Sequence, residues 1–366
     1  MLTFLWAGDI MLDKESALLQ GDYMGDEMKK LFASILVALY IIVCVVLTSC
    51  GIAEKESEGL NFVLNSDGGS YTLIGIGVCE DKNVVVPSKH EGLPVTAISE
   101  EAFKDDDEIT SIVIKEGVSE IGDGAFKGCT KLMSVSMPQS VASIGDEAFM
   151  DCKALSSVSI PNSVISIGDR AFEDCRAITS ITIPNSVTNV GEAVFSNCER
   201  LKSVVISSGI TSISDSMFAN TGLTSVVIPN GVEKIGSYSF LNCKKLSEIE
   251  ISSTVKTIGE SALQGCTSLT SIELPEGITT IYDRAFYCCS TLANIKLPSS
   301  LTHIGARAFQ YCEGLIGIKI PNNVTYIGED AFLDCKKLTI QCEAKSQPEG
   351  WSSNWNNDAL PVEWGK

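Results

Sequence analysis

The sequence predicts an α/β repeat solenoid, in which one short structural unit is stacked many times along a single axis. The main observation is an aromatic marker, usually Ala-Phe, that recurs at ten intervals, nine of 23 residues and one of 22. A unit of this length is too small to bury its own apolar side, so copies must stack and share one core. The markers are Phe103, Phe126, Phe149, Phe172, Phe195, Phe218, Phe240, Leu263, Phe286, Phe309 and Phe332.

A column of cysteines supports the same period. Three residues after the marker stand Cys129, Cys152, Cys175, Cys198, Cys243, Cys266, Cys289, Cys312 and Cys335. The one short interval falls where this Cys is missing, in the segment FANTGL. Two columns with one period indicate that every unit places the same residues at the same point of the fold.

Each unit begins with a predicted strand. In LSSVSIP, the residues Leu155, Val158 and Ile160 stand at the spacing L-x-x-L-x-L, and the stretch from Val158 to Ile160 alternates as a strand does. Pro161 ends the strand, because proline donates no ladder hydrogen bond. We expect this strand to form one face of the solenoid.

The second half of the unit predicts a short helical turn on the opposite face. Gly168 is expected to supply a backbone conformation closed to other residues. Asp169 is expected to cap the helical turn that carries Ala171 and Phe172. The sequence therefore predicts about eleven units of 23 residues, with short strands on one face and short helical turns on the other.

The repeated pattern L-x-S-I-x-I-P-x-S-V-x-x-I-G-x-x-A-F-x-x-C resembles the BspA-like leucine-rich repeat proteins of bacterial surfaces. The resemblance covers about residues 70–340, and EGLPVTAISEEAF and WSSNWNNDALPVEWG are similar to the ends of such arrays. It implies adhesion to host extracellular-matrix or plasma proteins, or to other microbial cells. Departures such as Leu263 for Phe, Met217 and Val194 for Ala, and the missing Cys predict an irregular curve near residue 220.

Residues 1–50 form a predicted signal region. Residues 28–50 contain a Lys pair, an apolar run from Leu31 to Leu47 and the ending LTSC, which resembles a bacterial lipobox with Cys50 as the lipidated residue. The alternative is an uncleaved membrane anchor. Residues 1–27 do not resemble the start of an export signal, so translation can start at Met1 or at Met28. Both alternatives predict an extracytoplasmic, surface-exposed protein of the cell envelope.

The remaining chain divides into four predicted parts. Residues 51–60 are a short acidic tether, and 61–95 are an incomplete unit that caps the N-terminal end. Residues 96–340 are the leucine-rich repeats. Residues 341–366 are a C-terminal cap containing Trp351, Trp355 and Trp364. An exposed apolar rung at either end of a solenoid needs such a cover.

Composition limits the partners. Apolar residues make up 45% of the chain, and the net charge of −19 argues against nucleic acid as a partner.

The cysteine column is predicted to be buried thiol rather than disulfide, although neighbouring strands are close enough for a bridge. Cys288, at a position where other units carry a turn residue, is expected to be more exposed. We predict no metal and no cofactor, because the sulfurs form a line and only His90 and His303 accompany them.

The candidate binding face consists of the residues that alternate with the buried ones on the strands. One column is mostly Ser, and the next changes from Ser, Thr and Val to Glu and then Lys. The candidate residues are Ser134, Ser157, Ser180, Thr182, Glu248, Glu250, Glu273, Lys296 and Lys319. The hydroxyl residues can equally be filler that keeps a crowded sheet soluble. The three glutamates can be a solvated patch, a Ca²⁺ site, or an acid and base for glycan chemistry.

The sequence contains none of the enzyme motifs that we sought. There is no G-x-S-x-G, no H-E-x-x-H and no P-loop, and two histidines leave few general bases. We therefore predict a lipid-anchored, adhesin-like surface protein that binds through the strand face and is not an enzyme. The alternatives are a structural envelope protein and, less favoured, a glycan-active enzyme that uses Glu250 or Glu273.

Overall fold

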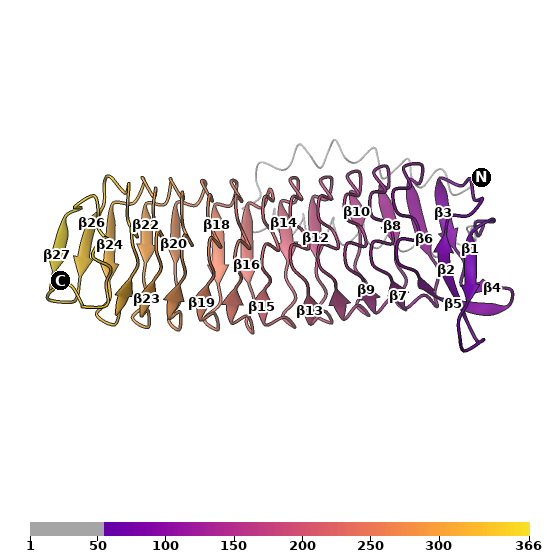
Figure 1. Ribbon diagram of the computed structural model, residues 1–366, viewed down its shortest axis with the longest axis horizontal. Coiled ribbons are helices and arrows are strands. Elements are labelled where there is room, and N and C mark those ends of the chain that lie inside the picture. Colours follow the sequence, from indigo (N-terminus) through magenta and orange to yellow (C-terminus); the bar gives the residue numbers. More distant parts are fainter. Residues whose placement is uncertain (1–54) are drawn as a thin grey trace, which may run out of the picture. The chain divides into compact units, whose positions relative to one another are not determined.

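The computed structural model describes residues 55–366, and Glu56–Lys366 form one compact unit. This unit is a β-solenoid of about 13 turns with roughly 23 residues per turn. Successive turns stack in sequence order from the N-terminal to the C-terminal end (Figure 1). The turn count exceeds the eleven markers because strands before Phe103 and after Phe332 complete further turns. The signal region, including Cys50, and residues 51–54 of the tether lie outside the described residues.

One side of the solenoid, which we call the strand face, carries one strand from each turn. Where these strands pair, they do so in parallel and in register, and most of them bury alternate residues. The strands are β3 (Asn83–Val86), β6 (Ser111–Ile114), β8 (Ser134–Ser136), β10 (Ser157–Val158), β12 (Ser180–Thr182), β14 (Ser203–Val205), β16 (Ser225–Ile228), β18 (Glu248–Ile251), β20 (Ser271–Glu273), β22 (Asn294–Lys296), β24 (Gly317–Ile320), β26 (Thr339–Cys342) and β27 (Val362–Trp364).

A second side, the short-strand face, carries two-residue strands that also pair in parallel. They are β7 (Glu120–Ile121), β9 (Ser143–Ile144), β11 (Ser166–Ile167), β13 (Asn189–Val190), β15 (Ser212–Ile213), β17 (Lys234–Ile235), β19 (Thr257–Ile258), β21 (Thr280–Ile281), β23 (His303–Ile304) and β25 (Tyr326–Ile327). At the N-terminal end this sheet continues through β5 (Leu93–Ile98), β2 (Tyr71–Gly75) and β1 (Asn61–Leu64), and β4 (Lys89–His90) pairs with β5.

Neither face is one continuous sheet. On the strand face, pairing stops between β10 and β12, between β14 and β16, and between β18 and β20. On the short-strand face it stops between β13 and β15. We call these four interruptions seams. Three of them lie between residues 158 and 228, so the irregularity expected near residue 220 is present and begins earlier in the chain.

The third side of the solenoid corrects the predicted helical turns, because the described residues contain no helix. Along residues 170–174, alternate N–H groups bond to the next turn: Arg170 N to Glu192 O at 2.8 Å and Phe172 N to Val194 O at 3.0 Å. Arg170 also has a φ of 54°, which no α-helix tolerates. Since the N–H groups that a helix would use internally bond between turns, this segment forms a third inter-turn ladder instead.

Two further expectations for this segment were wrong in their physical reason. Asp169 caps no helix; its Oδ1 accepts the N–H of Glu192 in the next turn at 2.7 Å. Gly168 has no positive φ, but a Cβ there would lie 2.3 Å from Asp146 Oδ1 and 2.5 Å from Asp146 N. Glycine is therefore required because adjacent turns approach closely, not because of an unusual backbone angle.

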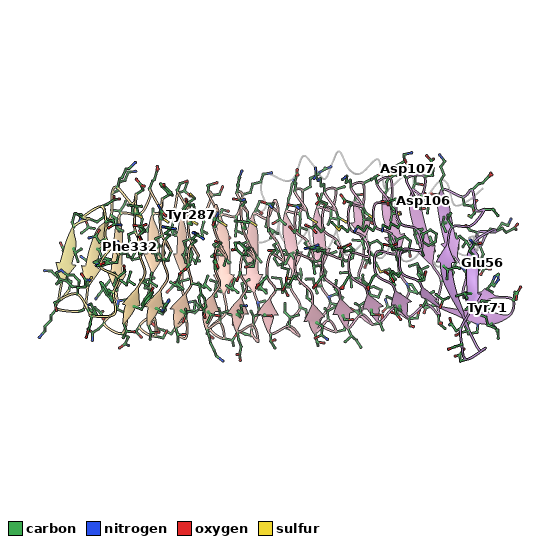
Figure 2. The ribbon with its side chains drawn as sticks, viewed as in Figure 1. Glu56, Tyr71, Asp106, Asp107, Tyr287 and Phe332 are labelled. Carbon is green, nitrogen blue, oxygen red and sulfur yellow. The ribbon has the colours of Figure 1, made fainter. Side chains whose placement is uncertain are left out.

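The core is a column of stacked aromatic rings between the three sides. The marker phenylalanines are fully buried, and consecutive rings such as Phe103 and Phe126 lie 5.1 Å apart with an angle of 7° between planes. Side chains fill the interior along its whole length (Figure 2). At the C-terminal end, the buried Trp355 packs its edge against Phe332, with 6.1 Å between ring centroids.

The cysteine column lies beside the aromatic column as free, buried thiols. Each thiol donates to the carbonyl of the marker residue one turn earlier, for example Cys152 Sγ to Phe126 O at 3.1 Å. Thr221 fills the position of the missing Cys, and its Oγ1 donates to Phe218 O in its own turn at 2.9 Å. Cys288 is half-buried and Cys79 likewise, in contrast to the column.

We predict that Phe172→Ala lowers the free energy of unfolding by about 3–5 kcal/mol, because it leaves a cavity in a closely packed column. Phe172→Leu should cost clearly less, since the column already accepts Leu263 at the same place in another turn. Urea denaturation followed by circular dichroism measures both. Equal losses for the two variants would show that ring stacking, rather than filled volume, determines the stability of the column.

We also predict that iodoacetamide at pH 8 labels Cys79 and Cys288 in the native protein and labels the column only after unfolding in urea. Burial raises the pKa of Cys129 and of Cys289 to about 12, so their reactive thiolate is scarce as well as inaccessible. Mass spectrometry of peptides identifies the labelled residues. Labelling of column cysteines without denaturant would contradict a closed core.

Candidate functional site

The strand face presents two columns of outward side chains whose spacing is set by the ladder. Ser134 pairs with Ser157 across β8 and β10, and Ser180 pairs with Ser203 across β12 and β14. In β12 the outward Ser180 and Thr182 are exposed while Ile181 between them is buried. Strands pair roughly 4.8 Å apart, so equivalent outward residues form a close row along the face.

The middle of the face is apolar and the next part is acidic. Val205 is 60% exposed and Val227 is 57% exposed, and both belong to the second outward column. The neighbours that follow in that column are Glu250 on β18 and Glu273 on β20, and Glu248 lies beside them in the first column. Exposed valines beside exposed carboxylates give the face a sharp change of chemistry.

The charged residues are only partly paired. Lys296 Nζ lies 2.8 Å from Glu273 Oε1, and both side chains remain 73% exposed. Lys319 instead pairs with Glu343 at 3.1 Å. Within residues 55–366, neither Glu248 nor Glu250 has a cationic partner. Lys296 therefore neutralises part of the charge of Glu273, whereas the negative charge of the other two glutamates is open to a partner.

A hollow of about 500 Å³ lies at the seam between β18 and β20, lined by Glu248, Glu250, Glu273 and Pro275. The described part of the chain contains no group of His, Cys, Asp or Glu side chains arranged to hold a metal ion. The three carboxylates lie on exposed positions of β18 and β20 and form a charged patch.

The short-strand face carries aromatic residues that the sequence reasoning did not group. His303 is half-buried and stacks on Tyr326, with 4.2 Å between ring centroids and 8° between planes. Burial lowers the pKa of His303. Tyr282, 46% exposed, stands where most turns carry the close-approach glycine. That replacement was the available sequence signal for this cluster.

Other candidate features lie outside the structure described. Cys50, the predicted lipidation residue, precedes residue 55. Among residues 55–366, no helix is long and apolar enough to cross a membrane.

The family described as BspA type Leucine rich repeat region (6 copies) matches residues 96–224 and 211–339. No curated protein matches the chain.

Two solved structures are similar over most of the chain. A leucine-rich repeat protein from Bacteroides ovatus ATCC 8483 is 24% identical with a TM-score of 0.57, covering 86% of this chain and 100% of its own. A leucine rich cell surface protein from Faecalibacterium prausnitzii A2-165 is 28% identical with a TM-score of 0.56, covering 87% of this chain and 96% of its own. Both likenesses concern the whole repeat array rather than one segment of it.

Proposed function

The chain belongs to the BspA-type leucine-rich repeat family, and from this premise we propose that it is a non-catalytic, adhesin-like binding protein of the bacterial cell surface. Its partners are host extracellular-matrix or plasma proteins, or neighbouring microbial cells. The observation that carries the proposal is the separation of two residue sets on the strand face. Inward residues such as Ile181 and Ile272 build the core, while outward residues between them are free to change.

The outward residues change in the way that a recognition surface requires. The row runs from hydroxyl side chains through exposed Val205 and Val227 to Glu250 and Glu273 and then to Lys296. Exposed charges that lack a strong internal partner contribute little to stability, so their arrangement is available for binding. Electrostatic complementarity of this kind chiefly raises association rate and specificity.

Anchoring and location are part of the same proposal. We propose that Cys50 is acylated and tethers the solenoid outside the cytoplasm. A cell-surface location is supported by the family and by the similar F. prausnitzii protein, which is described as a cell surface protein. The lipobox-like LTSC after an apolar run supports lipidation.

We predict that Cys50→Ser abolishes incorporation of labelled palmitate and moves the protein from the membrane fraction to the medium or periplasm. Membrane fractionation and metabolic labelling of the full chain expressed in a bacterium measure both effects. Cys44→Ser, a neighbouring cysteine within the apolar run, is the matched control and should leave both unchanged. Palmitate that persists in Cys50→Ser would contradict lipidation at this residue.

We predict that the charge-reversed variant Glu250→Lys, Glu273→Lys, Lys296→Glu, Lys319→Glu binds its partner at least tenfold more weakly. The variant keeps the net charge of the chain, so a loss of binding reports the pattern of charges and not their sum. Immobilised residues 51–366, which contain the whole compact unit, are tested by surface plasmon resonance against fibronectin, fibrinogen, collagen and mucin.

The control reverses an exposed ion pair away from the strand face, Glu233→Lys with Lys256→Glu, whose charged atoms lie 2.9 Å apart. It should bind as the unchanged protein does. Binding that both variants retain would move the site off the acidic part of the strand face. Absence of saturable binding to every panel member would contradict the adhesin-like role and favour a structural role in the envelope.

A further inference from the structure

The seam between β10 and β12 differs from the paired parts of the strand face in its backbone. At most junctions of this face a backbone hydrogen bond precedes the strand, such as Ser156 N to Met133 O at 3.0 Å and Lys202 N to Thr179 O at 2.9 Å. No corresponding bond joins Thr179 to Ser156 in the part of the chain that the structure describes. The edges of β10 and β12 therefore face each other without a ladder.

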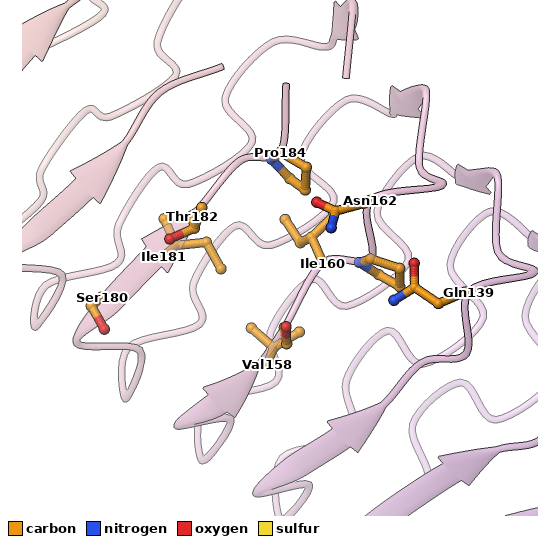
Figure 3. Close-up of a pocket in the computed structure, with 10 residues that line it drawn as sticks. Gln139, Val158, Ile160, Asn162, Ser180, Ile181, Thr182 and Pro184 are labelled. Carbon is orange, nitrogen blue, oxygen red and sulfur yellow. The ribbon is translucent and has the colours of Figure 1, made fainter. Parts of the chain in front are cut away.

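A hollow of about 350 Å³ opens at this seam (Figure 3). Val158, Ile160 and Ile181 give it an apolar floor, and Pro161 and Pro184 stand at its margin. Val158 is half-buried, as is Val204 two turns further on, whereas Val135 and Ile181 on the two adjacent strands are 5% and 4% exposed. The volume falls within the range of small-ligand sites, which is roughly 300–1,000 Å³.

The rest of the lining is polar and uncharged. The side chains are the hydroxyls of Ser159, Ser180 and Thr182 and the amides of Gln139 and Asn162. None of these five side chains has a hydrogen-bond partner among residues 55–366. The amide of the next turn is different, because Asn185 Oδ1 accepts a hydrogen bond from Ser208 N at 3.0 Å. The hollow thus collects free groups that both donate and accept.

The seam is too narrow to admit an extended peptide as an inserted strand. An inserted strand would hold its neighbours roughly 9.6 Å apart, twice the usual strand spacing. Behind the seam, Phe172 and Phe195 stack with 5.6 Å between centroids, and β11 and β13 remain paired. The two turns are therefore held together on the other sides, and only a ligand that lies in the hollow from outside can use it.

We propose that this hollow binds a neutral oligosaccharide, so that the surface protein inferred above, on which this proposal rests, recognises uncharged glycans. A sugar ring offers hydroxyls that donate and accept, which match the five free side chains, and a C–H face that packs on the apolar floor. Sialylated or sulfated sugars would bring a charge to a lining that contains no cation to receive it.

The test is an array of neutral oligosaccharides, including glucans, galactans, mannans and N-acetylglucosamine oligomers, beside sialylated and sulfated ones, probed with residues 51–366. The affinity for the best neutral oligosaccharide is then measured by isothermal titration calorimetry. Ser180→Trp, which fills the hollow, should weaken binding at least tenfold. Asn162→Asp, which keeps shape but replaces an amide donor by a carboxylate, should weaken it several-fold.

The matched control is Ser225→Trp, an equally exposed serine in the same outward column that does not line the hollow. It should bind as the unchanged protein does, and all variants should unfold at the same urea concentration. Neutral binding that survives Ser180→Trp overturns the site, and preference for charged glycans overturns the ligand class. Retained binding to the matrix-protein panel without any neutral glycan binding overturns this proposal alone, whereas loss of both contradicts the proposed function as well.

Discussion

The constraint on which the structure depends is that no turn can satisfy its own backbone or bury its own apolar side. Three inter-turn ladders hold the turns together. They lie on the strand face, on the short-strand face and along the segments that contain the marker residues, such as residues 170–174. The aromatic column lies between them and repeats at nearly the strand spacing. Stability in such an array is the sum of nearest-neighbour contacts, which explains why one unit is repeated with so little change.

The seams show where these requirements conflict. Ring separation is 5.1 Å between Phe103 and Phe126 but 5.6 Å between Phe172 and Phe195 and 5.9 Å between Phe195 and Phe218. On the strand face, the seam between β10 and β12 lies in the two turns that contain Phe172 and Phe195. On the short-strand face, the seam between β13 and β15 lies in the two turns that contain Phe195 and Phe218. A further strand-face seam follows the turn in which Leu263 replaces the aromatic ring. At these junctions the array opens one side while the others stay bonded.

The sequence was sufficient to predict the solenoid, its period, its family and the direction of the strand residues, because period and alternation act directly on burial. The sequence was misleading for the segment around Phe172, where it predicted a helical turn, since Phe172 and Cys175 at i and i+3 are typical of such a turn. The alternation of inter-turn and local hydrogen bonds at Arg170 and Glu173 has no signature in residue type. The seam beside Val158 was equally hidden, because SVSI reads as a strand as regular as any other in the array.

Residue type alone also fails to locate binding on a repeated surface. Ser180 and Ser203 are the same residue in the same column, paired in register, yet Ser180 lines a hollow and Ser203 does not. The strand-face hollows at β10 and β18 lie at seams, about four turns or roughly 19 Å apart, with neutral and acidic linings respectively. A chain can thus create distinct sites on a uniform sheet by breaking its ladder at chosen junctions, while the core behind each break remains closed.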